Sequence, residues 1–281
     1  MKILKYITIL FLSITLFSCS SDDDNTPETV LDETSGLVKI QEITNDTHTI
    51  ELYSASGKMV QGYNPVSLRI KDNKTKTYST DAQVEWTPLM HMTMMKHSCP
   101  KTAVTKAAGK KTVYEGGIIF QMAQNETEYW ELGLTYTINT VSYTASAKIS
   151  VPASAKRTVS SFKGTDGNNY VIAYIAPSSP KVAANDITVG LYKMEDMMTF
   201  SVPTDYTIKM DPRMPGMGNH GSPNNTDLLQ TNGLYNGKLS LTMTGYWKIN
   251  LQVLNAQNEV LKGEAVTTEN TASSLYFEIE F

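Results

Sequence analysis

The sequence predicts an all-β fold made of two tandem immunoglobulin-like β-sandwich domains. Segments such as YWELGLTYTI, SYTASAKISV and KLSLTMTGYWKINLQVL alternate apolar with polar residues and favour β-branched and aromatic types, as half-buried strands do. Turn-forming pairs punctuate these segments at Asp72-Asn73, Asp166-Gly167 and Asn236-Gly237. Because no helical periodicity extends beyond two turns, we expect sandwiches of about seven short strands each.

An internal repeat predicts where the two domains lie. HSCP at 97–100 aligns with HGSP at 220–223, YEGG at 114–117 with YNGK at 235–238, and YWEL at 129–132 with YWKI at 246–249. These landmarks recur in the same order, and their offset drifts by loop-sized amounts. We therefore expect one domain over 36–152 and a second over 165–281, joined by a linker at 153–164. Trp86, Trp130 and Trp247 fall on strand patterns and are expected in the cores.

The first residues resemble a bacterial lipoprotein signal. Lys2 and Lys5 accompany an apolar run over 7–17, which is too short for an ordinary membrane helix and indicates a signal peptide over 1–18. The LFSC sequence ending at Cys19 resembles a lipobox, in which the cysteine is lipidated and becomes the mature N-terminus. An acidic tether is expected over 19–35, and its SSDDDN sequence after Cys19 resembles the signal that sends Bacteroidota lipoproteins to the outer face of the outer membrane. The resemblance implies an outer-membrane lipoprotein, on the periplasmic or the cell-surface face.

Charge and motifs argue against two broad functions. The chain has 24 basic and 28 acidic residues, a net charge of −4, so it offers no electrostatic footprint for nucleic acid. It contains no Gly-x-Ser-x-Gly, no phosphate-binding loop and no His-Glu-x-x-His, so we do not expect an enzyme. If Cys19 is lipidated, Cys99 is the other cysteine and has no partner for an intramolecular disulfide.

Methionine and histidine are concentrated in two windows, TPLMHMTMMKHSCP at 87–100 and MDPRMPGMGNHGSP at 210–223. The windows hold 28 of 281 residues but seven of the fourteen Met and three of the four His. Aligned without a gap, His-x-x-Met-x-x-His in the first falls on Met-x-x-Met-x-x-His in the second. Methionine and histidine share a soft or borderline donor atom that binds Cu(I) and suits neither Ca²⁺ nor Mg²⁺.

The windows therefore predict two sites for copper as Cu(I). In the second window, two thioethers and one imidazole form a neutral three-coordinate set, whereas zinc would be expected to have more His, Cys or carboxylate. The predicted ligands are His91, Met94, His97 and Cys99 in the first window and Met214, Met217 and His220 in the second. The spacing leaves open whether other methionines join these sets, namely Met90, Met92, Met95, Met194 and Met210.

Methionine clusters have two other common roles, and both stay open here. Methionine fills gaps in cores and forms adaptable protein-contact surfaces. The second window argues against a core, because its prolines and glycines indicate a surface loop where an exposed methionine buries nothing. A third cluster, Met194, Met197 and Met198, has no counterpart in the first half and is expected to pack within a hairpin.

The second window resembles the Met-Pro-Gly-Met-Gly-His loop of YtkA-like and FixH-like extracytoplasmic domains. These are small β-sandwiches associated with copper handling and oxidase maturation. Asn219, inserted between Gly218 and His220, departs from the tightest form of that loop, and the first window resembles it only through the duplication. The resemblance implies copper traffic, with a copper-handling protein or a copper-requiring enzyme as partner.

The expected function is therefore that of a membrane-anchored extracytoplasmic copper-binding lipoprotein that sequesters Cu(I) or hands it on. The membrane would be contacted through the lipid anchor only. The alternative is a surface adhesion or assembly module that binds protein or glycan, with the methionine loops as contact surface.

Overall fold

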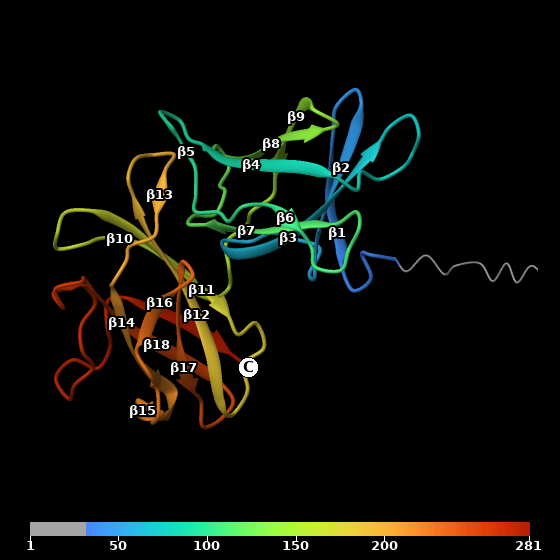
Figure 1. The fold of residues 1–281 in the computed structure, drawn as a ribbon. Helices are drawn as coiled ribbons and strands as arrows, with labels where there is room; N and C mark the ends of the chain where they lie inside the picture. Colours follow the sequence, from blue (N-terminus) through green and yellow to red (C-terminus); the bar gives the residue numbers. More distant parts are fainter. Residues whose placement is uncertain (1–31) are drawn as a thin grey trace, which may run out of the picture. The chain divides into compact units, whose positions relative to one another are not determined.

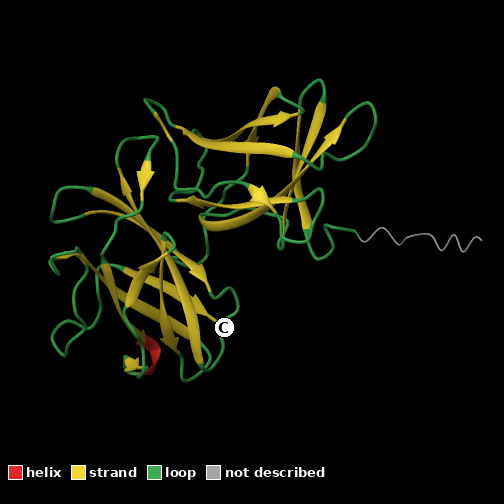
Figure 2. Cartoon of the chain, in the orientation of Figure 1, coloured by secondary structure: helices red, strands yellow, loops and turns green. Residues whose placement is uncertain are grey.

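The computed structural model describes residues 32–281, which form antiparallel β-strands joined by loops (Figure 1, Figure 2). The all-β prediction is confirmed. In this range the only helical element is a single 3-10 turn, η1 (Pro215–Met217), and no helix is long and apolar enough to cross a membrane. Cys19, the predicted signal peptide and most of the predicted tether lie outside the described residues.

Residues 38–149 form two sheets. Their strands are β1 (Val38–Thr44), β2 (His48–Ser54), β3 (Gly62–Asp72), β4 (Ala82–His91), β5 (Lys96–His97), β6 (Thr105–Lys106), β7 (Tyr114–Phe120), β8 (Tyr129–Ile138) and β9 (Val141–Ile149). One sheet has the order β1-β2-β3-β7-β6, and the other has the order β5-β4-β8-β9. All neighbouring strands are antiparallel.

Residues 159–280 form one eleven-stranded sheet with the path β10-β11-β12-β17-β16-β14-β18-β19. Its strands are β10 (Val159–Lys163), β11 (Asn169–Ala176), β12 (Ala184–Met194), β13 (Phe200–Ser201), β14 (Thr207–Met214), β15 (His220–Gly221), β16 (Leu228–Thr231), β17 (Leu234–Ser240), β18 (Tyr246–Leu254), β19 (Val260–Lys262) and β20 (Tyr276–Glu280). Strands β13, β15 and β20 branch from β12, β14 and β18.

The pairings of the first half recur in the second. β10-β11-β12-β17-β16 repeats β1-β2-β3-β7-β6, and β15-β14-β18-β20 repeats β5-β4-β8-β9, in the same chain order. The second half differs because β16 also pairs with β14 and so joins the two groups into one sheet. The immunoglobulin-like assignment and the division into two domains stay predictions, and residues 33–281 cluster as one unit by their contacts.

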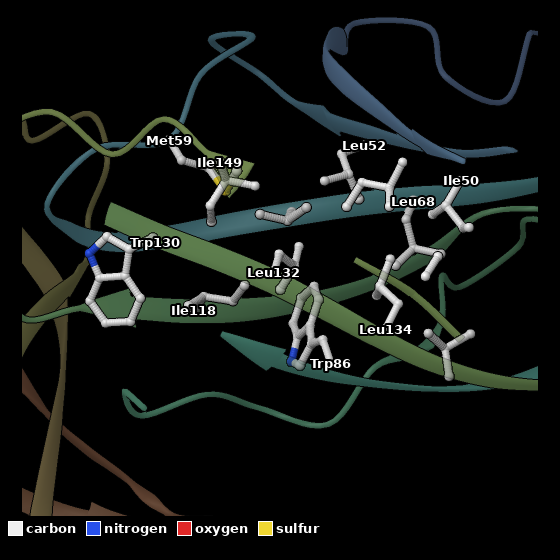
Figure 3. Close-up of a cluster of buried hydrophobic side chains, with 14 of the residues drawn as sticks. Ile50, Leu52, Met59, Leu68, Trp86, Ile118, Trp130, Leu132, Leu134 and Ile149 are labelled. Carbon is white, nitrogen blue, oxygen red and sulfur yellow. The ribbon is translucent and has the colours of Figure 1, made fainter. Parts of the chain in front are cut away.

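Alternation along the strands builds a separate hydrophobic core in each half. In β8, Trp130, Leu132 and Leu134 are buried, and the residues between them are more exposed, because successive side chains leave opposite faces of a strand. Figure 3 shows these three among the first-half core residues, with Met59 and Trp86. The second core contains Trp247, so all three tryptophans are buried as expected.

Strand β11 is buried on both faces. Ile172 contributes to the core of the second half, whereas Val171 and Ala173 on the opposite face pack with Ile119 of β7 in a small third cluster. Val159 of β10 belongs to the same cluster. This explains why β11 carries a nearly continuous apolar run and does not alternate.

Two local expectations differ from the structure. Strand β10 lies inside segment 153–164, which we expected to be a linker. Asn236-Gly237, expected at a turn, lies within β17, and the turn instead uses Asn232 and Gly233, both with positive φ. A Cβ on Gly237 would lie 3.0 Å from the carbonyl oxygen of Asp227, so this glycine permits close approach of two backbones.

Candidate metal-binding hairpins

The two Met/His windows form hairpins at corresponding places in the strand order. The first window makes the β4–β5 hairpin and the second makes the β14–β15 hairpin (Figure 1). In each half the longer strand of the hairpin pairs on its other side with the strand that carries Tyr-Trp, β8 or β18. The strand order thus gives both windows the same neighbours.

The register corrects the gap-free alignment of the windows. Met90 lies opposite His97, and Met214 lies opposite His220. Six residues separate the first pair and five separate the second, so the shorter turn shifts the alignment by one position. The counterpart of Met214 is therefore Met90 and not His91, and the apparent exchange of methionine for histidine disappears. Met90 and Met214 are both buried in their cores.

The β4–β5 turn exposes Met94, whereas the His91 ring lies against Tyr129. Met92 N donates to Met95 O at 3.0 Å, which leaves Met94 at the tip with 90% of its surface exposed. His91 stacks on the Tyr129 ring, with centroids 4.7 Å apart. Its Nε2 lies 3.3 Å from Glu131 Oε2, an ion-pair distance if the ring is protonated, but the geometry is not that of a hydrogen bond.

His97 is buried and has three polar neighbours. Its Nδ1 lies 2.8 Å from the Ser98 carbonyl oxygen and 3.2 Å from the Gln121 amide nitrogen. Its Nε2 lies 3.3 Å from the Met122 sulfur. The imidazole packs edge-on against the Trp130 ring, with centroids 5.5 Å apart. The structure therefore brings a predicted ligand together with a methionine outside both windows.

Cys99, a predicted first-window ligand, lies in the hydrophobic core with 1% of its surface exposed. Burial raises the pKa of this thiol well above its ordinary value, and the nearby Lys101 only partly opposes this. Metal ligands are thiolates, so a thiol held neutral in an apolar core is poorly suited to bind an ion. The ligand role of Cys99 stays a prediction, and its burial argues against it.

The second hairpin differs from the first in exposing the histidine of its cross-strand pair. Met217 lies on η1, the red turn in Figure 2, and 59% of its surface is exposed. Gly218 and Asn219 then adopt positive φ values of 64° and 58°, which brings the exposed His220 back opposite Met214. Asn219, the departure from the family loop, tolerates this conformation better than most residues, and its amide donates to Thr271 O at 3.0 Å.

Sequence reasoning missed Met122 and its counterpart Met243. The Trp130 indole donates to the Met122 carbonyl at 3.0 Å, and the Trp247 indole donates to the Met243 carbonyl at 3.0 Å. Met122 follows Tyr114 by the same number of residues as Met243 follows Tyr235, from 114 to 122 and from 235 to 243. That constant spacing, extending the Tyr-Gly landmark of the repeat, is the signal that could have identified both.

The third methionine cluster lies beside the first hairpin. Ser98 N, next to His97, donates to Met197 O at 2.8 Å, and Met197 and Met198 are exposed in the turn between β12 and β13. The expected role of these residues in hairpin packing stays a prediction.

Within residues 32–281, no three His, Cys, Asp or Glu side chains are grouped as a metal site would require. Compared with known proteins, the chain matches no protein-family model and no curated protein. The similarity to YtkA-like and FixH-like domains therefore remains a resemblance of one loop and of general architecture.

Proposed function

We propose that this protein is a membrane-anchored extracytoplasmic copper-binding lipoprotein that sequesters or hands on Cu(I). The observation that carries the proposal is the recurrence of one hairpin in both halves. Each hairpin places a methionine opposite a histidine, Met90 with His97 and Met214 with His220, and exposes another methionine near its tip. Thioether and imidazole donors select soft monovalent copper over hard cations.

Elemental analysis and chelator competition test the copper proposal. The full chain, purified in detergent with and without added copper, should retain about two Cu(I) per chain against a weak Cu(I) chelator. Met94→Leu and Met217→Leu test the exposed methionines of the two hairpins, since Leu nearly conserves volume and removes the sulfur. A wild-type chain that retains no copper under anaerobic reducing conditions would contradict the proposal.

The anchor is tested separately. If Cys19 carries lipid, Cys19→Ser should block lipoprotein processing, so the variant should keep its signal peptide and gain no lipid mass. It should also no longer fractionate with the outer membrane as the mature lipoprotein does. An unchanged mass and distribution would remove the lipoprotein part of the proposal and leave the copper part standing.

A surface adhesion or assembly module is the second candidate. It is favoured by the exposed methionines of both hairpins and by a groove of about 660 Å³ beside β4. The groove is lined by Gln83, Glu85, Trp86, Lys101 and Thr102, among others, a mixture of polar and apolar groups that suits a peptide or a glycan. Retention of no copper, together with binding of an extracellular protein or glycan, would favour this function.

A further inference from the structure

The Met122 sulfur and the His97 Nε2 nitrogen each direct an unshared electron pair toward the other. The Ser98 carbonyl oxygen can only accept a hydrogen bond, so a hydrogen bond across its 2.8 Å contact places a proton on His97 Nδ1. The Gln121 amide nitrogen, 3.2 Å from Nδ1, then donates to the Ser98 carbonyl at 3.1 Å and not to the ring. In a neutral imidazole the other nitrogen, Nε2, is then unprotonated. This nitrogen faces the Met122 sulfur at 3.3 Å, and a thioether sulfur is itself only an acceptor.

Two facing acceptors need a positive centre between them. A metal ion about 2.0 Å from a histidine nitrogen and about 2.3 Å from a sulfur would hold donors 3.3 Å apart at an angle of about 100°. Metal-binding histidines typically donate their other ring N–H to a carbonyl or carboxylate, as His97 does to Ser98. The separation of His97 Nε2 and Met122 Sδ therefore fits two ligands of one ion, and the Nδ1 hydrogen bond to Ser98 is of the kind that orients a metal-binding histidine.

The surroundings favour a soft ion and keep the pair in place. His97 has 6% of its surface exposed, and its ring packs edge-on against Trp130. Met90 lies opposite His97 on the same face of the β4–β5 ladder and brings a second thioether to that face. No carboxylate is among the polar contacts of His97 in residues 32–281, and neutral nitrogen and sulfur donors suit a monovalent soft ion.

We propose that His97 Nε2 and Met122 Sδ are the ligand pair that holds Cu(I) in the first half of the chain. This rests on the proposed copper function and changes its ligand set, because Met122 lies outside both windows. Met94 at the exposed tip then serves entry or transfer of the ion, and the buried pair retains it.

Three matched variants of the full chain test the assignment. Met122→Leu removes the sulfur that faces His97. Met59→Leu removes a sulfur buried in the same hydrophobic core, and Met94→Leu removes the exposed one at the tip. Cu(I) supplied anaerobically and competed with a chelator should be bound at least about tenfold more weakly by Met122→Leu. Met59→Leu should bind as the wild type does.

The outcomes separate the two proposals. Wild-type binding that Met122→Leu leaves unchanged overturns the ligand pair but not the copper function, whereas a wild type that binds no Cu(I) overturns the function. Equal losses in Met122→Leu and Met59→Leu would show a packing effect and also overturn the pair. A second readout needs no copper: ¹⁵N shifts of metal-free protein at pH 8 should show His97 protonated at Nδ1 only. A proton on Nε2 would mean a hydrogen bond to sulfur and contradict the proposal.

Discussion

His97 and Cys99 are two positions apart, and their surroundings give them opposite chemistry. His97 is buried among polar atoms that hold its ring through Nδ1 and leave Nε2 facing a sulfur. Cys99 is buried among apolar side chains, and burial raises its thiol pKa. The same window thus contains the imidazole that we propose as a ligand and a thiol kept neutral.

Cys99 should be unreactive in the folded protein. A thiol reagent at pH 8 should label it only after unfolding in denaturant, because both access and thiolate formation are blocked in the core. Mass spectrometry before and after denaturation gives the measurement, and Cys99→Ala provides the blank. Rapid labelling in native buffer would show that the segment around Cys99 opens and would return the thiol to the list of ligands.

Glu51 should contribute to the acid limb of stability. Burial raises its pKa, but hydrogen bonds from Lys39, Tyr53 and Tyr78 outweigh this and lower it below the ordinary value of 4.5. The stabilisation is therefore complete above the unfolded-state pKa and is lost as pH falls through the lower folded-state value. Glu51→Gln should reduce the free energy of unfolding at pH 7 by about 2 kcal/mol and flatten its decline below about pH 4.5.

Glu42 provides the control for that measurement. Its carboxylate also pairs with Lys39, at 2.7 Å against 2.8 Å for Glu51, but its side chain is 47% exposed. An exposed ion pair contributes at most about 1 kcal/mol, so Glu42→Gln should change the urea midpoint little. Equal losses of stability in Glu51→Gln and Glu42→Gln would show that burial of Glu51 does not strengthen its ion pair with Lys39.

At the scale of elements, a glycine after β19 allows two segments to pack closely. Gly263 has φ of +88°, and a Cβ there would lie 2.0 Å from the Leu251 carbonyl oxygen. Gly263→Ala should therefore cost about 3 kcal/mol or more, from backbone strain and displacement of β18. Gly233→Ala, at φ of +80° with no atom within 4 Å, should cost only about 1 kcal/mol. Similar urea midpoints for the two variants would contradict this.

Strand periodicity was enough to predict the class of fold. Segments such as β8 and β9 alternate as the sequence suggested, because one face meets a core and the other meets solvent. The turn at Asp166-Gly167 was also predicted, and Gly167 has φ of +82° there. Strand β10 was missed because VSSFK is short and polar, and its burial comes from neighbours distant in sequence.

The positions of the candidate ligands were harder to predict because hairpin register decides them. A shift of one residue moves a side chain to the opposite face of a strand. The gap-free alignment matched His91 with Met214, whereas the ladders match Met90 with Met214. The contact between His97 and Met122 joins segments 25 residues apart and leaves no local pattern. In the sequence, Met122 is marked only by its spacing from Tyr114, which equals the spacing of Met243 from Tyr235.

At the scale of the whole molecule, one pattern of strands gives the two proposed copper sites unequal surroundings. Met243 has the place of Met122, since each carbonyl accepts from a buried tryptophan, and His220 has the place of His97 in its ladder. The first histidine is buried and held, whereas His220 is exposed. A preformed site binds more tightly because less freedom is lost on binding.

Titration with Cu(I) against a chelator should therefore show two unequal steps. The first equivalent should bind at least about tenfold more tightly than the second, a difference of about 1.4 kcal/mol. Met122→Leu should abolish the tight step and keep the weak one, and His220→Asn should do the reverse. Two such steps would be expected if the exposed second site exchanges its ion with a partner and the first retains its own. Two steps of equal affinity, or loss of both steps in His220→Asn, would mean that the hairpins act as one site and not as a retaining site with an exchanging site.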